Sequence, residues 1–213
     1  MRRVGSILSI LVLTGCARTI SAPSLLPDTM AHQRGLTSGT FQTIYIFRGE
    51  PDGAVPQGQL LSVKGVLYGT TNYGGDSHPF CYPGNGCGTV YSINPKSAVY
   101  MLLYSFGGLL YGDGAFPNAE LIKAKKELWG TTTAGGDGQC NISGGCGTVF
   151  SITTAGSEMV QWSFQGGKAD GAAPFGPLMQ FDHNLYGTTM FGGSTAGCGG
   201  KGCGAVYEIT PPP

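Results

Sequence analysis

The sequence predicts an all-β protein that repeats one unit of four short strands three times. Three observations lead to this prediction. A pentapeptide recurs, as LYGTT at 67–71, LWGTT at 128–132 and LYGTT at 185–189. Gly accounts for 38 of the 213 residues, as expected where many tight turns need positive φ. Hydrophobic residues make up 41% of the chain, which argues for a folded core and against disorder.

Fixed spacings define the three copies of the unit. Each copy opens on an Asp-Gly-Ala-x-Pro stretch, continues through the pentapeptide to a Gly-Gly pair, and rejoins the others in a Gly-Cys-Gly strand. The copies differ in length only in loops. The opening stretches are DGAVP 52–56, DGAFP 113–117 and DGAAP 170–174, and the closing strands begin GCGTV 86–90, GCGTV 145–149 and GCGAV 202–206. Such a period indicates units that must stack to bury a core.

Each unit is expected to form a hairpin followed by two further strands. In the first copy the hairpin joins QLLSV 59–63 to GVLYGTT 65–71 across a Lys-Gly turn. The third strand is TVYSIN 89–94, which mixes β-branched and aromatic residues, and the fourth is VYMLLYSF 99–106.

The fourth strand of the last unit is expected to come from the other end of the chain. The second copy has EMVQWSF at 158–164 in this position, whereas the third copy reaches its final prolines without a counterpart. TFQTIYIF at 40–47 stands before the first copy and looks like the missing strand. We therefore predict that residues 40–47 complete the third unit and remove its exposed edge.

The predicted architecture is a propeller-like array of three four-stranded units within one domain, residues 37–213. The units span about 48–106, 107–164 and 165–213, and strand 40–47 completes the last one. Twelve strands with threefold pseudo-symmetry also fit a β-trefoil or a β-prism. Propellers typically have four to eight blades, so three units would form an open arc, a strained ring or half of a dimeric ring of six.

The N-terminus has the features of a targeting segment. Residues 1–15 combine Arg2 and Arg3 with a short apolar run, which is typical of a secretory signal and too short to span a bilayer. Leu-Thr-Gly-Cys at 13–16 resembles the lipobox of bacterial lipoproteins, which implies cleavage before Cys16 and lipidation of its sulfur. An ordinary signal peptide with a chance Cys is the alternative.

The residues after the signal are expected to attach the domain to the cell envelope. Residues 16–36 hold the lipidated Cys and a segment without stable periodicity, which we interpret as a flexible tether. Because several acyl chains anchor a protein stably, the membrane is a predicted partner. Ala17 follows the Cys where inner-membrane retention would use Asp, so the resemblance implies the outer membrane in a Gram-negative cell. The predicted location is extracytoplasmic and lipid-anchored.

The repeated unit, DGAxPxxxLxxxxxxLYGTTxxGG followed by GxGTVxxI, resembles the GloVer tandem repeat. This repeat is found in secreted or anchored surface proteins of bacteria. The likeness covers about residues 41–209 and implies propeller-like folding, although members usually carry more than three copies. The family supplies no established enzymatic residues.

Six of the seven Cys fall in pairs at one equivalent loop of each unit, and the seventh is Cys16. Export permits disulfides, so we predict one intra-loop disulfide per unit. A metal site is the alternative, but CxxC spacing is absent and no His recurs beside the pairs. The predicted pairs are Cys81–Cys87, Cys140–Cys146 and Cys198–Cys203.

No feature of the sequence indicates an enzyme. Asp52, Asp113 and Asp170 recur, but Asp-Gly turns whose carboxylates cap backbone amides account for them, with a calcium site as the alternative. The three His do not recur in register, and no nucleophile or metal motif is present. We expect no catalytic residue, metal or cofactor; the alternative is a polysaccharide-acting hydrolase with two carboxylates facing a cleft. Twelve basic and 12 acidic residues give no case for nucleic acid as a partner.

Binding through the Cys loops is the predicted function. Residues 72–87, 133–145 and 190–202 vary in sequence and length on a constant scaffold, which is where binding surfaces are often placed. Aromatic rings beside amides suit a glycan or a protein ligand. A passive structural or assembly element of the envelope is the alternative, and a homo-oligomer would complete a ring. The candidate ligand-binding residues are Tyr73, Phe80, Tyr82, Asn85, Gln139, Asn141, Phe191 and Lys201.

Overall fold

The computed structural model describes residues 39–76, 81, 85–108, 111–138, 140, 144–194 and 198–213. Residues Gln42–Pro213 form one compact unit, and of the unit Met1–Phe41 only residues 39–41 are described. The predicted signal peptide, Cys16 and the tether therefore lie outside the described residues. No helix in the described part of the chain has the length and apolar character needed to cross a membrane.

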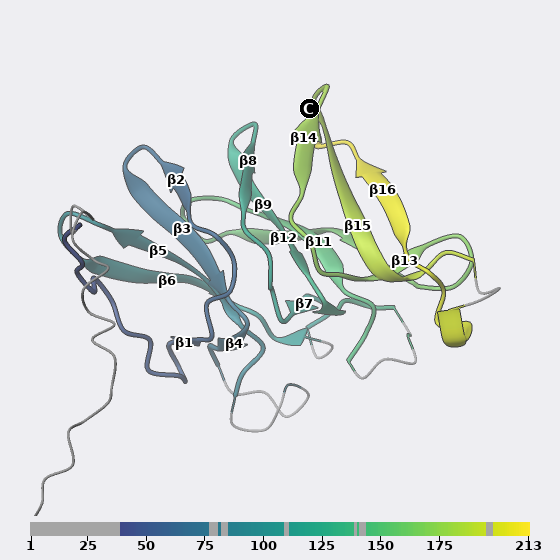
Figure 1. Ribbon diagram of the computed structural model, residues 1–213, viewed down its shortest axis with the longest axis horizontal. Helices are drawn as coiled ribbons and strands as arrows, with labels where there is room; N and C mark the ends of the chain where they lie inside the picture. The colour runs from purple at the N-terminus through teal and green to yellow at the C-terminus, as the bar shows by residue number, and fades with distance from the viewer. Residues whose placement is uncertain are drawn as a thin grey trace, which may run out of the picture. The chain divides into compact units, whose positions relative to one another are not determined.

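The described chain is all-β, and its repeats form three antiparallel sheets that follow one another in chain order (Figure 1). The first sheet contains, in order, β2 (Leu61–Val63), β3 (Val66–Thr71), β5 (Thr89–Asn94) and β6 (Val99–Ser105). The second has the equivalent order β8 (Ile122–Ala124), β9 (Glu127–Thr132), β11 (Thr148–Ile152) and β12 (Glu158–Ser163). In the third, β15 (Asn184–Gly192) lies between β14 (Met179–Phe181) and β16 (Ala205–Ile209). The three sheets form a row, and the turns of their first hairpins all lie on the same side of that row (Figure 1).

A short ladder at the opening of each unit was not predicted. The pairs are β1 (Gly53–Ala54) with β4 (Tyr73–Gly74), β7 (Gly114–Ala115) with β10 (Ala134–Gly135), and β13 (Gly171–Pro174) with the end of β15. The Asp-Gly-Ala-x-Pro stretch thus pairs with the Gly-Gly pair of the same unit. At Gly74, φ is 86° and a Cβ would lie 2.7 Å from the Cα of Gly53, so only Gly fits.

The repeated pentapeptide has a structural role at each of its last three positions. Its Gly lies opposite an aromatic residue of the third strand, and a Cβ at Gly130 would lie 2.6 Å from the ring of Phe150. In the first two units its first Thr bonds to the next unit, as Thr131 does by donating to a backbone carbonyl at 3.3 Å. Its second Thr joins neighbouring strands, as in the 2.8 Å contact between the hydroxyls of Thr132 and Thr148. The pentapeptide therefore stabilises every unit internally and links each of the first two units to the next one.

An aromatic contact couples each unit to the one that follows. A Phe just after the fourth strand packs edge-on against the aromatic residue at the centre of the next sheet. The ring centroids lie 5.1 Å apart for Phe106–Phe150 and 5.0 Å apart for Phe164–Tyr207. Phe106 and Phe164 are 0% and 1% exposed, each within a buried cluster that spans two consecutive sheets.

The prediction that residues 40–47 complete the last sheet is wrong. These residues form no strand, and Phe47 packs against Tyr91 of the first sheet with ring centroids 5.0 Å apart. Tyr45 stacks on Tyr100 at 4.2 Å and donates its hydroxyl to the opening Asp of the unit at 2.8 Å. Because these local contacts hold the segment beside the first unit, it does not reach the third. The described residues show no closed ring or propeller arrangement.

Phe106→Ala is expected to lower the free energy of unfolding by about 3–5 kcal/mol, because it leaves a cavity between two sheets. Phe106→Leu should cost less, since it keeps most of the apolar volume. Equilibrium unfolding in urea measures both changes. The control is Met159→Ala, at a side chain that is 63% exposed on β12, and it should change the free energy by less than about 0.5 kcal/mol. An equal cost for Phe106→Ala and the control would contradict the proposed coupling of the sheets.

Candidate functional site

Three disulfides lie at the end of the sheets opposite the first hairpin turns. They join Cys81 to Cys87, Cys140 to Cys146 and Cys198 to Cys203, with Cα atoms 5.2, 5.3 and 5.4 Å apart. The predicted pairing is confirmed in all three units. Because disulfides form and persist in oxidising compartments, the protein is extracytoplasmic.

The bases of the three Cys loops share one frame of backbone hydrogen bonds. In every unit the first Gly of the Gly-Gly pair donates to a carbonyl two residues before the second Cys, and accepts from the Gly after that Cys. The first bond measures 2.5, 2.5 and 2.9 Å for Gly74, Gly135 and Gly192, and the second measures 3.1 Å in every unit. Loops of different sequence therefore start from the same rigid support.

The structure describes half of the predicted ligand-binding residues. Tyr73 is half-buried and packs against Phe116 of the next unit at 5.5 Å between centroids, so it joins two units. Phe191 is also half-buried, with the Lys201 ammonium 5.4 Å from its ring centroid. Asn85 is exposed, and its carbonyl accepts from Gly74 at the loop base. Phe80, Tyr82, Gln139 and Asn141 lie outside the described residues.

The recurring Asp residues cap backbone amides, as the Asp-Gly turns predicted. Asp52 accepts from the N–H of Gly53 at 2.7 Å, and Asp170 accepts from the N–H of Gly171 at the same distance. Asp113 accepts from the N–H of Gly107 through both oxygens, at 3.1 and 3.0 Å. Within the described ranges, no three His, Cys, Asp or Glu side chains gather as a metal site would require.

A second carboxylate meets Asp113 where the first and second units join. The Tyr104 hydroxyl donates to Asp113 at 2.8 Å, and Glu158 on β12 lies close enough for Asp113 to raise its pKa. Burial is the larger cause, and together burial and Asp113 raise the pKa of Glu158 to about 7. Burial also raises the pKa of Asp113, which is 5% exposed. The group can hold a proton near neutral pH, but Asp113 is closed to a substrate.

Sequence reasoning missed Glu158 because no carboxylate recurs at its position. Strand pairing makes it the equivalent of Tyr100, since Ile152 faces Glu158 as Ile93 faces Tyr100. The carboxylate that faces Tyr100 behaves differently from Asp113. Burial raises the pKa of Asp52, but hydrogen bonds from Gly53 and Tyr45 among others outweigh it and leave that pKa below its ordinary value. An alignment of the fourth strands would have shown that Glu158 in the second unit replaces Tyr100 in the first.

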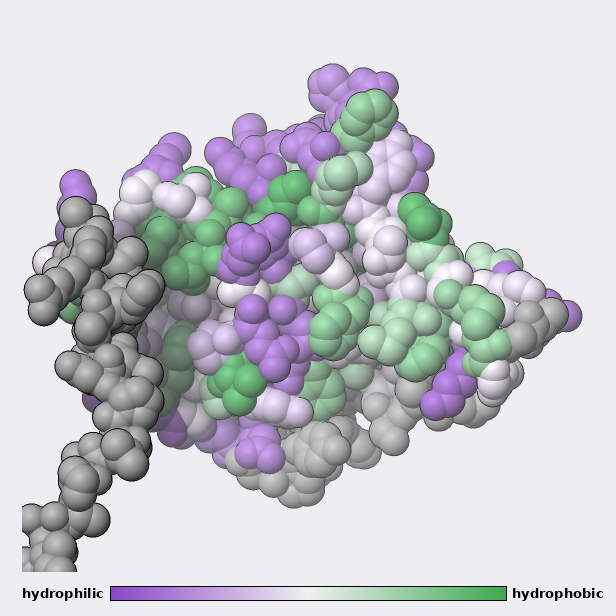
Figure 2. Space-filling model, viewed as in Figure 1, coloured by the Kyte–Doolittle hydropathy of each residue, from purple (hydrophilic) through white to green (hydrophobic). Residues whose placement is uncertain are grey.

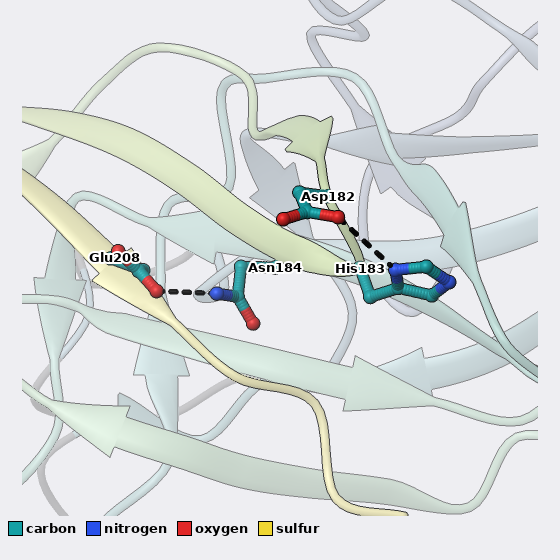
Figure 3. Close-up of polar contacts among 4 residues, drawn as sticks. All are labelled: Asp182, His183, Asn184 and Glu208. Atoms are coloured by element: carbon teal, nitrogen blue, oxygen red, sulfur yellow. Dashed lines mark hydrogen bonds and ion pairs between the residues drawn. The ribbon is translucent and has the colours of Figure 1, made fainter.

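Four polar side chains at and beside the β14–β15 turn form two separate pairs (Figure 3). His183 Nδ1 lies 3.6 Å from Asp182, and both side chains are almost fully exposed. Asn184 donates to Glu208 across the β15–β16 pair. Figure 3 shows the imidazole directed away from Glu208, so the two carboxylates do not converge on one point. His183 lies in the turn between β14 and β15, and this group offers no catalytic geometry.

A pocket of about 270 Å³ lies where the final prolines meet the β8–β9 hairpin. The Lys125 ammonium donates to the carbonyl of Pro211 at 2.9 Å and also to that of Pro212. Trp129 forms part of the lining, is 1% exposed, and has an indole N–H without a hydrogen-bond partner. Because the chain's own carbonyls engage Lys125, we assign this pocket to packing of the proline segment.

These features define a disulfide-bridged β-repeat protein of an extracytoplasmic compartment. The chain belongs to the Gloeobacter/Verrucomicrobia repeat family, whose model matches residues 32–213. This match confirms the family resemblance of the repeated unit. No curated protein and no solved structure gives a match.

Glu158→Gln is expected to raise the melting temperature at pH 8 by about 2–6 °C and to change it by less than about 1 °C at pH 5. The raised pKa means that the folded protein holds this proton more tightly than the unfolded chain, so stability falls as pH rises from about 4.5 to about 7. Gln resembles the protonated acid and removes this loss. Scanning calorimetry at both pH values measures the effect.

The matched control for this pH experiment is Glu50→Gln, at an exposed position. It should shift the melting temperature equally at the two pH values. A Glu158→Gln effect that is likewise independent of pH would show that ionised Glu158 does not strain the junction.

Proposed function

We propose that the protein is a lipid-anchored, extracytoplasmic β-repeat module that binds a protein or glycan ligand through its three disulfide-bridged loops and catalyses no reaction. The observation that carries this proposal is the contrast between loop base and loop sequence. The bases share the same backbone hydrogen bonds in every unit, whereas the sequences between the Cys differ. Rigid supports that present variable segments are typical of binding surfaces.

The absence of catalysis is proposed from the geometry of the acidic groups. Asp52, Asp113 and Asp170 are engaged by backbone amides, and Asp113 is buried beside Glu158. A glycosidase needs both carboxyl groups to reach one sugar. Among the described residues, one carboxyl group has a pKa raised to about 7, and it is Glu158 beside Asp113. This pair lies at the junction of two units, where we assign it to the contact between the sheets.

Attachment to the envelope is proposed from the lipobox resemblance at residues 13–16, with Cys16 as the lipidated residue. The tether at 16–36 would then hold the repeat domain away from the lipid surface, with the outer membrane as the location in a Gram-negative cell. The disulfides agree with this side of the membrane, because they require an oxidising compartment.

Tyr82→Ala is expected to reduce ligand binding at least about tenfold, because aromatic side chains are enriched among the residues that dominate binding energy. The full chain, purified in detergent, is applied to an array of bacterial envelope glycans and to a panel of envelope proteins. The control is Phe175→Ala, at a ring 52% exposed outside the Cys loops, which should bind as the wild type does. Binding that survives replacement of residues 82–85, 141–144 and 199–201 by Gly-Ser sequence would contradict a loop site.

Cys16→Ser is expected to abolish acylation, because the thiol is the acceptor for the lipid. Cells that express the full chain are fed an alkyne-labelled fatty acid, and the label on the purified protein is measured. Cys203→Ser, which removes a thiol from the third loop instead, should retain the label. An unlabelled wild-type protein that is recovered outside the membrane fraction would mean that residues 1–15 form an ordinary signal peptide.

A structural or assembly role is the second candidate, and one observation favours it. Val206 on β16 is 78% exposed, while the equivalent Val90 and Val149 are both 0% exposed. The third sheet thus carries a surface of the kind that the other two sheets bury. Such a surface serves contacts between proteins.

A further inference from the structure

The trailing face of a sheet, meaning the face that carries the aromatic residue of the pentapeptide, is buried by the next unit in the first two sheets. Tyr68 and Val90 of the first sheet are 7% and 0% exposed, in a cluster that includes Leu128 of the second sheet. Trp129 and Val149 of the second sheet are 1% and 0% exposed, in a cluster that includes residues of the third. Two successive junctions therefore show what covers this face.

The third sheet leaves its trailing face open. Val206 is 78% exposed, and Phe181 and Met179 on β14 are 65% and 60% exposed. Ala124, at the position of Phe181 in the second unit, is 1% exposed. Figure 2 shows strongly hydrophobic atoms exposed over β16. Large apolar side chains gathered on one sheet face mark an interaction surface.

The strand edge beside this face is also open. β5 pairs with β6, and β11 pairs with β12. Among the strands that the structure describes, none pairs with β16 on the side away from β15. An open edge presents N–H and C=O groups in a row, ready to pair with another strand. The third unit thus offers an apolar face and a backbone edge together.

The first unit carries the surface that would fit this face. Leu60 is 48% exposed, whereas Leu121 and Leu178, at the same position in the next two units, are 2% and 5% exposed. Leu121 is buried in the cluster that the first and second sheets share, and Leu178 in the one that the second and third share. Leu60 has no preceding unit to cover it within the described chain.

Residues 42–47 stand where a preceding unit would place its fourth strand. Phe47 meets the centre of the first sheet as Phe106 and Phe164 meet the second and third, with ring centroids 5.0, 5.1 and 5.0 Å apart. Yet these residues pair with no strand, and Ile46 is 71% exposed. The segment therefore has the position of a fourth strand without a third strand to pair with.

We propose that two copies of this chain associate head to tail, with residues 42–47 of one copy adding a strand to β16 of the other, and with the first sheet of that copy covering the open trailing face. A second copy is the partner because the chain itself shows twice how such a unit covers this face. The contact uses none of the three Cys loops, so it stands apart from the proposed ligand binding. This proposal rests on the structural or assembly role described above as the second candidate function, and it names the partner and the contact surface for that role.

A head-to-tail contact joins unlike surfaces, so each copy keeps one free end unless the assembly closes. Two copies hold six sheets of this type, which lies within the four to eight blades that propellers use. The propeller-like array expected for the family would then form from two chains, with each chain supplying three blades.

Val206→Glu is expected to weaken association at least about tenfold, because it buries an unpaired charge in the contact. Native mass spectrometry and sedimentation of the full chain in detergent are expected to show two or more chains for the wild type and a single chain for the variant at the same concentration. Met159→Glu, at a side chain also well exposed on a strand, is the control and should keep the wild-type mass. A wild-type protein that stays a single chain at all concentrations overturns the proposal, as does unchanged association of Val206→Glu.

A photo-reactive benzophenone amino acid at position 206 distinguishes the modes of contact. Mixing isotopically labelled and unlabelled chains before irradiation shows whether a cross-link joins two copies. Cross-links from position 206 to residues 42–60 of another copy support the head-to-tail contact. Cross-links between two positions 206 would reveal a twofold dimer, and cross-links to residues 42–60 of the same chain would reveal closure of three units; either result overturns the proposal.

Discussion

Stacking of consecutive sheets is the constraint on which the rest of this structure depends. A unit of short strands is too small to bury a core alone, so each sheet must be covered by a neighbour. Phe47 and the Phe residues that follow β6 and β12 make this contact with nearly one geometry, since the three pairs of rings lie 5.0, 5.1 and 5.0 Å apart at angles of 70°, 70° and 69°. Because the junction repeats, the loops that leave each sheet also repeat in position. The common frame of the disulfide loops is built from backbone hydrogen bonds within each unit.

The opening Asp of each unit connects this stacking to the chain path. Its carboxylate accepts from the backbone N–H one residue after the junction Phe, as Asp113 does from Gly107 and Asp170 from Gln165. The turn thereby leads the chain from the fourth strand of one unit into the ladder that opens the next. The partners of the carboxylate differ between units, with Glu158 near Asp113 where Tyr100 stands near Asp52. One backbone design can therefore have junctions of different stability and different pH dependence.

The repeat, the hairpins and the disulfides could be predicted from the sequence because each is encoded locally, by a spacing, a strand pattern or a pair of Cys. The position of residues 40–47 could not be predicted in this way. A strand-like composition indicates that a segment favours an extended backbone, but it does not indicate which sheet the segment contacts. Stacking of Tyr45 on Tyr100 decides this, and no spacing in the sequence reports it. Aromatic residues near the loops were equally ambiguous, since Tyr73 and Phe191 prove to be half-buried and engaged with neighbouring side chains.

The two ends of the row of sheets differ in a way that follows from this repetition. At the first sheet, Tyr45 and Phe47 cover Tyr91 and Tyr100, with ring centroids 4.2 to 5.9 Å apart. At the third sheet, the described residues supply no comparable cover for Val206, and the same face carries an exposed Glu208 where the first two sheets bury Ser92 and Ser151. Repeat proteins stay soluble by capping their end units, so one covered and one open end give the row a direction. The cover is itself made from a sequence related to the fourth strands, which is the element that the open end lacks. Ends that are complementary rather than alike favour polar, head-to-tail association over a twofold contact between identical surfaces.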